Sequence, residues 1–225
     1  MVGLLLPQTP ASAQNQAAHP PHHLQYEKDI QAFEAADKTN PPAPGGILLI
    51  GSSSIRNWTT APAQFPKHRL ILRGFGGSYL SDSVAFADRI AIPYKPKLIL
   101  LYAGDNDIAG GKSAEQVFAD FKEFVAKIQA ALPETRIGYI AIKCSPSRVK
   151  YLEPMRTANR LIQEFAATDP RLIYVDVFTP ALDAAGQPRP ELYVGDRLHL
   201  NVAGYKLWAD IIGPDMDEVD PPAKK

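Results

Sequence analysis

Five short apolar segments, each bounded by glycine, proline or polar residues, constrain the fold of this chain more than any other feature. They are rich in leucine and β-branched residues and cover residues 47–50, 69–72, 98–102, 137–142 and 172–175. Segments of this length and composition are typical of parallel strands that are covered on both faces. The chain is therefore expected to contain a parallel sheet with helices packed against it.

Helical patterns alternate with these segments. In the clearest one, Ser113 and Gln116 fit a capping box, apolar residues recur at helical spacing from Val117 to Leu132, and Pro133 marks the end. Further amphipathic helices are predicted at residues 26–37, 156–167 and 204–212. The alternation predicts an α/β fold, a three-layer α/β/α sandwich with a five-stranded parallel sheet.

The 225 residues, 45% hydrophobic and 21% charged, indicate one globular domain, which we place at residues 26–216, followed by a polar tail at 217–225. Residues 1–25 are expected to be a truncated signal peptide or a disordered leader. The apolar run 2–6 and the small residues 11–13 favour a signal peptide, but no lysine or arginine precedes Lys28. A signal peptide would make the protein secreted or periplasmic, and a leader of another kind would leave it cytoplasmic.

Charge and cysteine content exclude several classes of partner. The formal net charge is zero, so nothing suggests a nucleic-acid partner. The single cysteine, Cys144, cannot form an intrachain disulfide or a cysteine-based zinc site, and a buried position is expected for it. No apolar run approaches the ~20 residues that span a bilayer. We expect no metal and no cofactor, and the oligomeric state stays open.

Polar, glycine-rich sequence follows each of the first three predicted strands. The segments are Gly51-Ser-Ser-Ser54, Gly74-Phe-Gly-Gly-Ser78 and Ala103-Gly-Asp-Asn-Asp107. Each one alone is typical of an ordinary turn. Because the carboxyl ends of parallel strands meet at one edge of a sheet, the three together predict a site there.

A fourth polar segment near the C-terminus contains Asp196 and His199, three residues apart. In a helical turn the two side chains would share a face. The carboxylate could then accept a hydrogen bond from one imidazole nitrogen and leave the other nitrogen to act as a base. In isolation such a pair is more often a capping aspartate and a surface histidine, so its interest depends on the serine loop.

Taken in order, the four segments resemble the four blocks of the SGNH, or GDSL-type, esterase and acylhydrolase superfamily, over about residues 45–213. The nucleophile of that family lies two residues after the glycine of the first block, which selects Ser53, with Trp58 as the aromatic residue that often follows. Ser52 stands where the family usually has aspartate. Ser52 and Ser54 are expected to hydrogen-bond within the loop or to cap the next helix.

The resemblance implies a sheet of flavodoxin-like (SGNH hydrolase) topology and a serine hydrolase that cleaves carboxylic esters through an acyl-enzyme. Ser53 would be the nucleophile, His199 its base and Asp196 the group that orients the histidine. The oxyanion hole would consist of the backbone N–H groups of Ser53 and Gly77 and the side-chain amide of Asn106. The expected substrate is a small-molecule or carbohydrate ester with a short acyl or acetyl group.

Three alternatives remain open. The chain could be a lysophospholipase or thioesterase of the same fold, a flavodoxin-like protein that binds a phosphate or another ligand, or a carbohydrate-binding relative without activity. A phosphate binder would not require the Asp196 and His199 pair. Three basic residues near predicted strand ends could meet an anionic or sugar substrate, although solvent-facing charges are the default: Arg73, Lys143 and Arg148.

Overall fold

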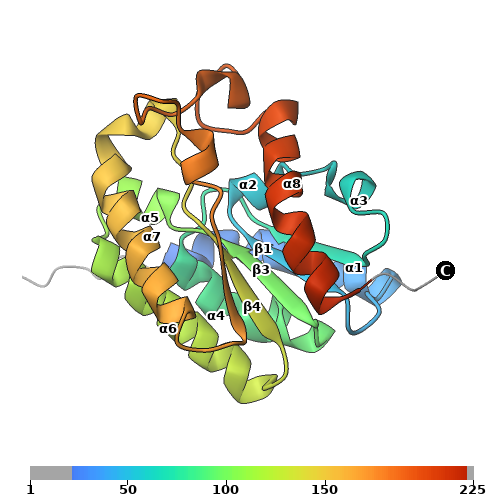
Figure 1. Cartoon of the computed structure of the whole chain (residues 1–225). Helices are drawn as coiled ribbons and strands as arrows, with labels where there is room; N and C mark the ends of the chain where they lie inside the picture. Colours follow the sequence, from blue (N-terminus) through green and yellow to red (C-terminus); the bar gives the residue numbers. More distant parts are fainter. Residues whose placement is uncertain (1–21, 222–225) are drawn as a thin grey trace, which may run out of the picture.

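The computed structural model describes residues 22–221 and contains a five-stranded parallel sheet (Figure 1). Its strand order is β2-β1-β3-β4-β5, which confirms the predicted α/β sandwich of flavodoxin-like topology. The strands are β1 (Ile47–Gly51), β2 (Leu70–Gly74), β3 (Leu98–Tyr102), β4 (Arg136–Ile140) and β5 (Leu172–Val175). The predicted leader at residues 1–21 and the last residues of the predicted tail, 222–225, lie outside the described residues.

The order of the strands decides which helices share a face. The connections β2–β3, β3–β4 and β4–β5 cross the sheet in one direction, so right-handed crossovers place their helices on one face. These helices are α4 (Leu80–Ile90), α6 (Ala114–Ala131) and α7 (Leu152–Ala166), with α1 (Glu27–Thr39) packed beside α4. The β1–β2 connection runs the opposite way, and its helix α3 (Ala61–Gln64) packs on the other face with α8 (Val202–Val219) (Figure 1).

Several shorter elements complete the chain. Two helices of one turn follow β1 and β3, namely α2 (Ser53–Arg56) and α5 (Asp105–Ala109). The 3-10 helices are η1 (His22–Tyr26), η2 (Ile92–Tyr94), η3 (Pro146–Tyr151), η4 (Thr179–Ala181) and η5 (Pro190–Leu192).

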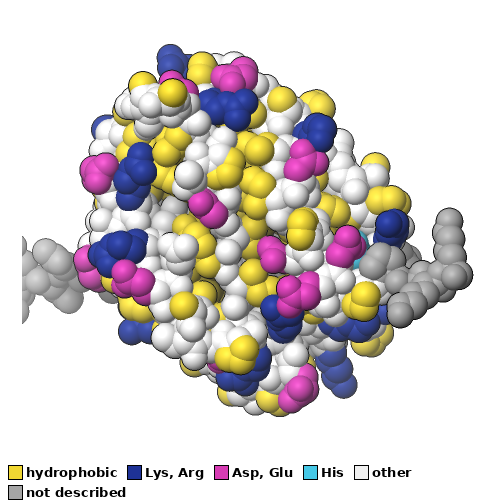
Figure 2. All heavy atoms as spheres, viewed as in Figure 1, with side chains coloured by type: hydrophobic (Ala, Val, Ile, Leu, Met, Phe, Trp, Pro, Cys, Tyr) yellow, Lys and Arg dark blue, Asp and Glu magenta, His cyan; other side chains and the backbone are white. Residues whose placement is uncertain are grey.

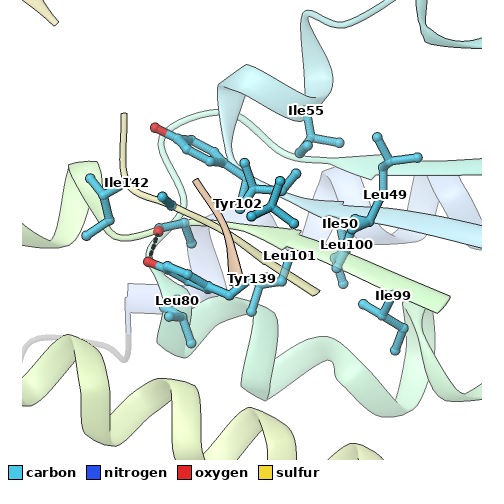
Figure 3. Packing of buried hydrophobic residues seen from close by; sticks show 14 of the residues in the cluster. Leu49, Ile50, Ile55, Leu80, Ile99, Leu100, Leu101, Tyr102, Tyr139 and Ile142 are labelled. Atoms are coloured by element: carbon cyan, nitrogen blue, oxygen red, sulfur yellow. Dashed lines mark hydrogen bonds between the residues drawn. The ribbon is translucent and has the colours of Figure 1, made fainter. Parts of the chain in front are cut away.

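The core forms around β1 and β3, in which every residue is buried. Apolar side chains point to both faces of these strands, as expected for a sheet covered on both sides (Figure 3). Of the two tyrosines labelled there, Tyr139 donates a hydrogen bond of 2.8 Å from its hydroxyl to the carbonyl of Ala103. On the other face, the buried Trp58 stacks on Tyr205 and meets Trp208 edge-on, which ties the turn after α2 to α8.

The helices match the predicted pattern with two corrections. The capping box of α6 is present, with Gln116 N–H bonded to Ser113 Oγ at 3.2 Å and Ser113 N–H to Gln116 Oε1 at 2.8 Å. Helix α7 begins at Leu152, before the predicted start at 156. Helix α8 continues through Pro214 to Val219 because Met216, beyond the proline, is buried in the core, so the expected domain end at 216 falls inside this helix.

Charges of both signs are interspersed on the face shown in Figure 2, and no broad patch of one sign lies there. Within residues 22–221, no helix combines the length and apolar character needed to cross a membrane.

Candidate functional site

The loops that follow β1, β2 and β3 meet at the carboxyl edge of the sheet, as their positions predict. Phe75 N–H donates to the carbonyl of Gly51 at 2.9 Å, and Ser52 N–H donates to the carbonyl of Tyr102 at 3.0 Å. These bonds join the first loop to the other two. The three polar segments therefore form one continuous rim.

Gly51 allows β1 to turn sharply into α2. Its φ is +135°, and a Cβ at this position would lie 1.9 Å from the carbonyl oxygen of Tyr102, so a side chain here would clash with β3. Beyond the turn, Ser52 and Ser54 are buried, whereas Ser53 is only half-buried. The turn thus presents one of its three serines at the rim.

The hydroxyls of Ser52 and Ser54 do not make the expected loop or cap bonds. Ser52 is the N-cap residue of α2, but its side chain accepts no capping hydrogen bond. Among the described residues neither hydroxyl has a hydrogen-bond partner. The turn is held by main-chain bonds instead, since the carbonyl of Ser52 accepts from Ile55 and Arg56 and the carbonyl of Ser54 accepts from the Tyr205 hydroxyl at 2.9 Å.

His199 links the first segment to the fourth. Its Nε2 lies 3.0 Å from Ser53 Oγ, and its Nδ1 lies 2.5 Å from Asp196 Oδ2. Since a carboxylate only accepts, Nδ1 carries the imidazole proton and Nε2 is left as an acceptor for the serine hydroxyl. The serine, the histidine and the aspartate are therefore joined in the order that a base-activated nucleophile needs.

The segment from Asp196 to His199 does not form the helical turn that the three-residue spacing of these side chains suggested. It is an irregular turn in which Arg197 has a φ of +60°. Asp196 Oδ1 holds this turn by accepting the N–H groups of Leu198 and His199, both at 2.9 Å. Hydrogen bonds from the His199 side chain and from these two N–H groups lower the pKa of Asp196 to about 2. The carboxylate, 47% of whose side chain is exposed, is therefore ionised throughout the neutral pH range.

The proposed oxyanion donors belong to the same rim. Gly77 has a φ of +87°, which favours glycine. Asn106 Nδ2 donates a hydrogen bond of 3.2 Å to the carbonyl of Ser78, the residue that follows Gly77. Ser53 is the first residue of α2, so its N–H is not used inside the helix. Asp107 binds the loop from below by accepting Leu80 N–H at 3.0 and 3.1 Å.

Arg73, Lys143 and Arg148 were expected by default to face solvent, and this expectation is wrong for all three. The Arg73 side chain is largely buried and paired with Asp37 at 2.5 Å. Lys143 is 1% exposed and lies 2.6 Å from Asp105, while the half-buried Arg148 donates to Asn106 Oδ1 at 2.8 Å. Position directly after the apolar run 137–142 was the only sequence signal for Lys143. Tertiary contacts decide where the other two side chains go.

Cys144 is buried, as expected, and burial raises the pKa of its thiol to about 11, which makes it a poor nucleophile. Among residues 22–221 no three histidine, cysteine, aspartate or glutamate side chains come together in a way that could hold a metal ion. A hollow of about 570 Å³ lies at the opposite end of the strands, where β3 and β4 begin, and its lining includes none of the candidate site residues.

One family of known proteins matches most of the chain. The model of the GDSL-like Lipase/Acylhydrolase family matches residues 46–207. No protein of curated function matches the sequence significantly.

Solved structures with low sequence identity share the fold. A protein from Streptococcus pneumoniae has 23% identity and a TM-score of 0.75, with 86% of this chain and 94% of that chain covered. A GDSL-like lipase from Bacteroides thetaiotaomicron has 17% identity and a TM-score of 0.68, with coverages of 88% and 98%. A catalytic mutant of an acetylxylan esterase from Geobacillus stearothermophilus has 14% identity and a TM-score of 0.63, with coverages of 77% and 95%.

Proposed function

Because the chain belongs to the GDSL-like lipase/acylhydrolase family, we propose that it is a serine esterase that hydrolyses carboxylic esters of short acyl groups through an acyl-enzyme. The observation that supports this most strongly is the hydrogen-bonded series from Ser53 Oγ through His199 to Asp196, with distances of 3.0 and 2.5 Å. A ligand-binding protein with the same sheet would have no use for a histidine held in this tautomer.

In the first step Ser53 Oγ attacks the ester carbonyl carbon and its proton passes to His199 Nε2. Asp196 stabilises the resulting imidazolium and keeps the ring in place. The carbonyl oxygen becomes an oxyanion, which the N–H groups of Ser53 and Gly77 and the amide of Asn106 would bind. Each such donor can contribute about 3–4 kcal/mol to the stabilisation of the transition state.

The tetrahedral intermediate then collapses. The bond to the alcohol oxygen breaks, and His199 Nε2 gives its proton to the departing alkoxide, so that an alcohol leaves and the acyl group stays on Ser53. A water molecule next attacks the acyl carbon while the neutral imidazole accepts its proton. Return of that proton to Ser53 Oγ releases the carboxylic acid and restores the enzyme.

The exposure of the site favours a substrate whose alcohol part extends into solvent. The side chains of His199 and Asp196 are 27% and 47% exposed, so the rim is open on the side of the leaving group. The acetylxylan esterase among the structural neighbours makes acetylated sugars the first natural class to test. A lysophospholipase or thioesterase activity would instead require room for a long acyl chain.

A hydrolysis panel tests this proposal. Purified protein is assayed with p-nitrophenyl acetate, butyrate and octanoate and with acetylated xylo-oligosaccharides, alongside Ser53→Ala and His199→Ala. We expect the acetate and butyrate esters to be cleaved faster than the octanoate and both variants to lose turnover. A preference for octanoate would move the proposal to the long-chain class, and equal rates in wild type and Ser53→Ala would overturn the serine mechanism.

A further inference from the structure

Three charged side chains form a connected group behind Asn106. Lys143 Nζ lies 2.6 Å from Asp105 Oδ2 and 3.0 Å from the hydroxyl of Tyr102. The same carboxylate oxygen lies 3.4 Å from Arg148 Nη1, and Arg148 Nη2 donates to Asn106 Oδ1 at 2.8 Å. The group therefore connects the buried Lys143, through Asp105 and Arg148, to the amide of Asn106 in the loop after β3, which we call the oxyanion loop.

The burial of this group is unusual for charged residues. The side chains of Lys143 and Asp105 are 1% and 5% exposed, and that of Arg148 is 15% exposed. Burial opposes ionisation of Asp105, but the positive charges of Lys143 and Arg148 outweigh it and keep the pKa of this carboxyl below its ordinary value. Because a well-packed apolar group of the same size is often at least as stabilising as buried charges, stability alone gives little reason to place them here.

The arrangement fixes which end of the Asn106 amide faces the second loop. A guanidinium group has donors only, so the amide atom beside Arg148 must be the oxygen. The amide nitrogen is then directed to the opposite side, where it lies 3.2 Å from the carbonyl of Ser78, next to Gly77. With the amide reversed, two donors would meet at Arg148 and an oxygen would face the place where an oxyanion needs a donor.

We propose that Arg148 is a positioning residue that holds the Asn106 amide with its N–H groups toward the oxyanion, and that Asp105 and Lys143 hold Arg148 in turn. This inference rests on the proposed esterase function. Arg148 also polarises the amide, since a cation at Oδ1 strengthens the Nδ2–H donors. If Arg148 only stabilised the η3 segment, its removal would lower stability, and its effect on kcat would not depend on whether Asn106 is present.

A double-mutant cycle tests the proposal with p-nitrophenyl acetate as substrate. The proteins are wild type, Arg148→Ala, Asn106→Ala and the double variant. Arg148→Ala should lower kcat by about 10- to 100-fold, with a smaller change in KM. This is less than the loss expected when the Asn106 donor itself is removed. In the Asn106→Ala background the same change should alter kcat by less than about threefold, because the group that it positions is gone.

Two further variants complete the design. Lys150→Ala removes an exposed charge from the same η3 segment and should leave kcat within about twofold of wild type. Arg148→Lys keeps the charge beside Asp105 but cannot reproduce the planar fork that reaches Asp105 and Asn106 together. Its kcat should also fall only when Asn106 is present. Arg148→Lys can therefore replace Arg148→Ala in the double-mutant cycle if Arg148→Ala fails to fold.

The outcomes separate the two proposals. If wild type hydrolyses the ester but the effects of Arg148→Ala or Arg148→Lys and Asn106→Ala multiply, the positioning role is overturned and the esterase function stands. An unchanged kcat in Arg148→Lys and Arg148→Ala has the same meaning. If wild type shows no esterase activity, both proposals fall.

Discussion

The role of Asp196 can be tested by a substitution that leaves its turn intact. In Asp196→Asn, Oδ1 still accepts the N–H groups of Leu198 and His199, so the turn that carries the histidine should persist. The other oxygen, which lies 2.5 Å from His199 Nδ1, becomes an NH2 group. Two donors then face each other unless the imidazole proton moves to Nε2, where it prevents acceptance of the Ser53 proton.

The expected loss of kcat is about 10²–10³. A hydrogen bond to a charged group contributes about 1.5–3 kcal/mol, and the lower end, a factor of about ten, applies because solvent screens an exposed carboxylate. The wrong tautomer adds a further factor of about 10–100. The total is smaller than the ~10⁴ lost when a buried triad aspartate becomes asparagine, because 47% of the Asp196 side chain is exposed.

The assay is the initial rate of p-nitrophenyl acetate hydrolysis at pH 5–8. In this range Asp196 is fully ionised, since its pKa is about 2, so its own protonation does not affect the comparison. Asp183→Asn is the matched control, because Asp183 Oδ1 holds an exposed turn by accepting the N–H groups of Ala185 and Gln187 and contacts no histidine. A loss in Asp196→Asn below about fivefold, or equal to that in Asp183→Asn, would refute the tautomer argument and reduce Asp196 to a turn residue.

Two other predictions concern the oxyanion loop. Asn106→Ala should lower kcat by about 10²–10³ with little change in KM, since the donor acts mainly in the transition state; steady-state kinetics in which only KM rises would instead make Asn106 a substrate-binding residue. Burial raises the pKa of Asp107 from 3.8 to about 6. Between these two pH values the folded protein holds a proton on Asp107 that the unfolded chain has released. The resulting contribution to stability is full below about pH 4 and is lost as the pH rises through 6. The free energy of unfolding of wild type relative to Asp107→Asn, from urea titrations, should therefore fall by up to about 3 kcal/mol between pH 4 and pH 7, and a flat difference would mean that Lys112 and Leu80 N–H keep Asp107 ionised.

Local sequence pattern was sufficient for the sheet. The predicted strands 98–102 and 172–175 have the observed bounds, whereas the predicted strand 137–142 extends two residues past the end of β4 at Ile140. Helix α4 does not stand out in the sequence, since it buries Asp82 and Ser83 among its apolar residues. The extension of α8 beyond Pro214 was also not predictable locally, because it depends on packing against the rest of the core.

For the site, the sequence could identify groups that follow strands but not their supports. Ser53 and Asn106 belong to short polar segments whose place at the sheet edge follows from the strand order, whereas His199 was identified from its spacing to Asp196 and from the family resemblance. The contacts of Lys143 and Arg148 with the β3 loop join residues about forty positions apart, and no local pattern reports them. Charged side chains are usually solvent-facing, which is why their burial had to come from the structure.

Active-site labelling shows directly which serine is the nucleophile, the role that we assign to Ser53. Wild type, Ser52→Ala, Ser53→Ala and Ser54→Ala are treated with a fluorophosphonate, and the adduct is mapped by tandem mass spectrometry of the peptide that contains the three serines. We expect a single adduct on Ser53 with loss of activity in proportion to labelling. The Ser52 and Ser54 variants should also be labelled, and Ser53→Ala should not, although its circular dichroism should match wild type. An adduct on Ser52 or Ser54 in the wild-type protein, or hydrolysis that continues in fully folded Ser53→Ala, would contradict this assignment.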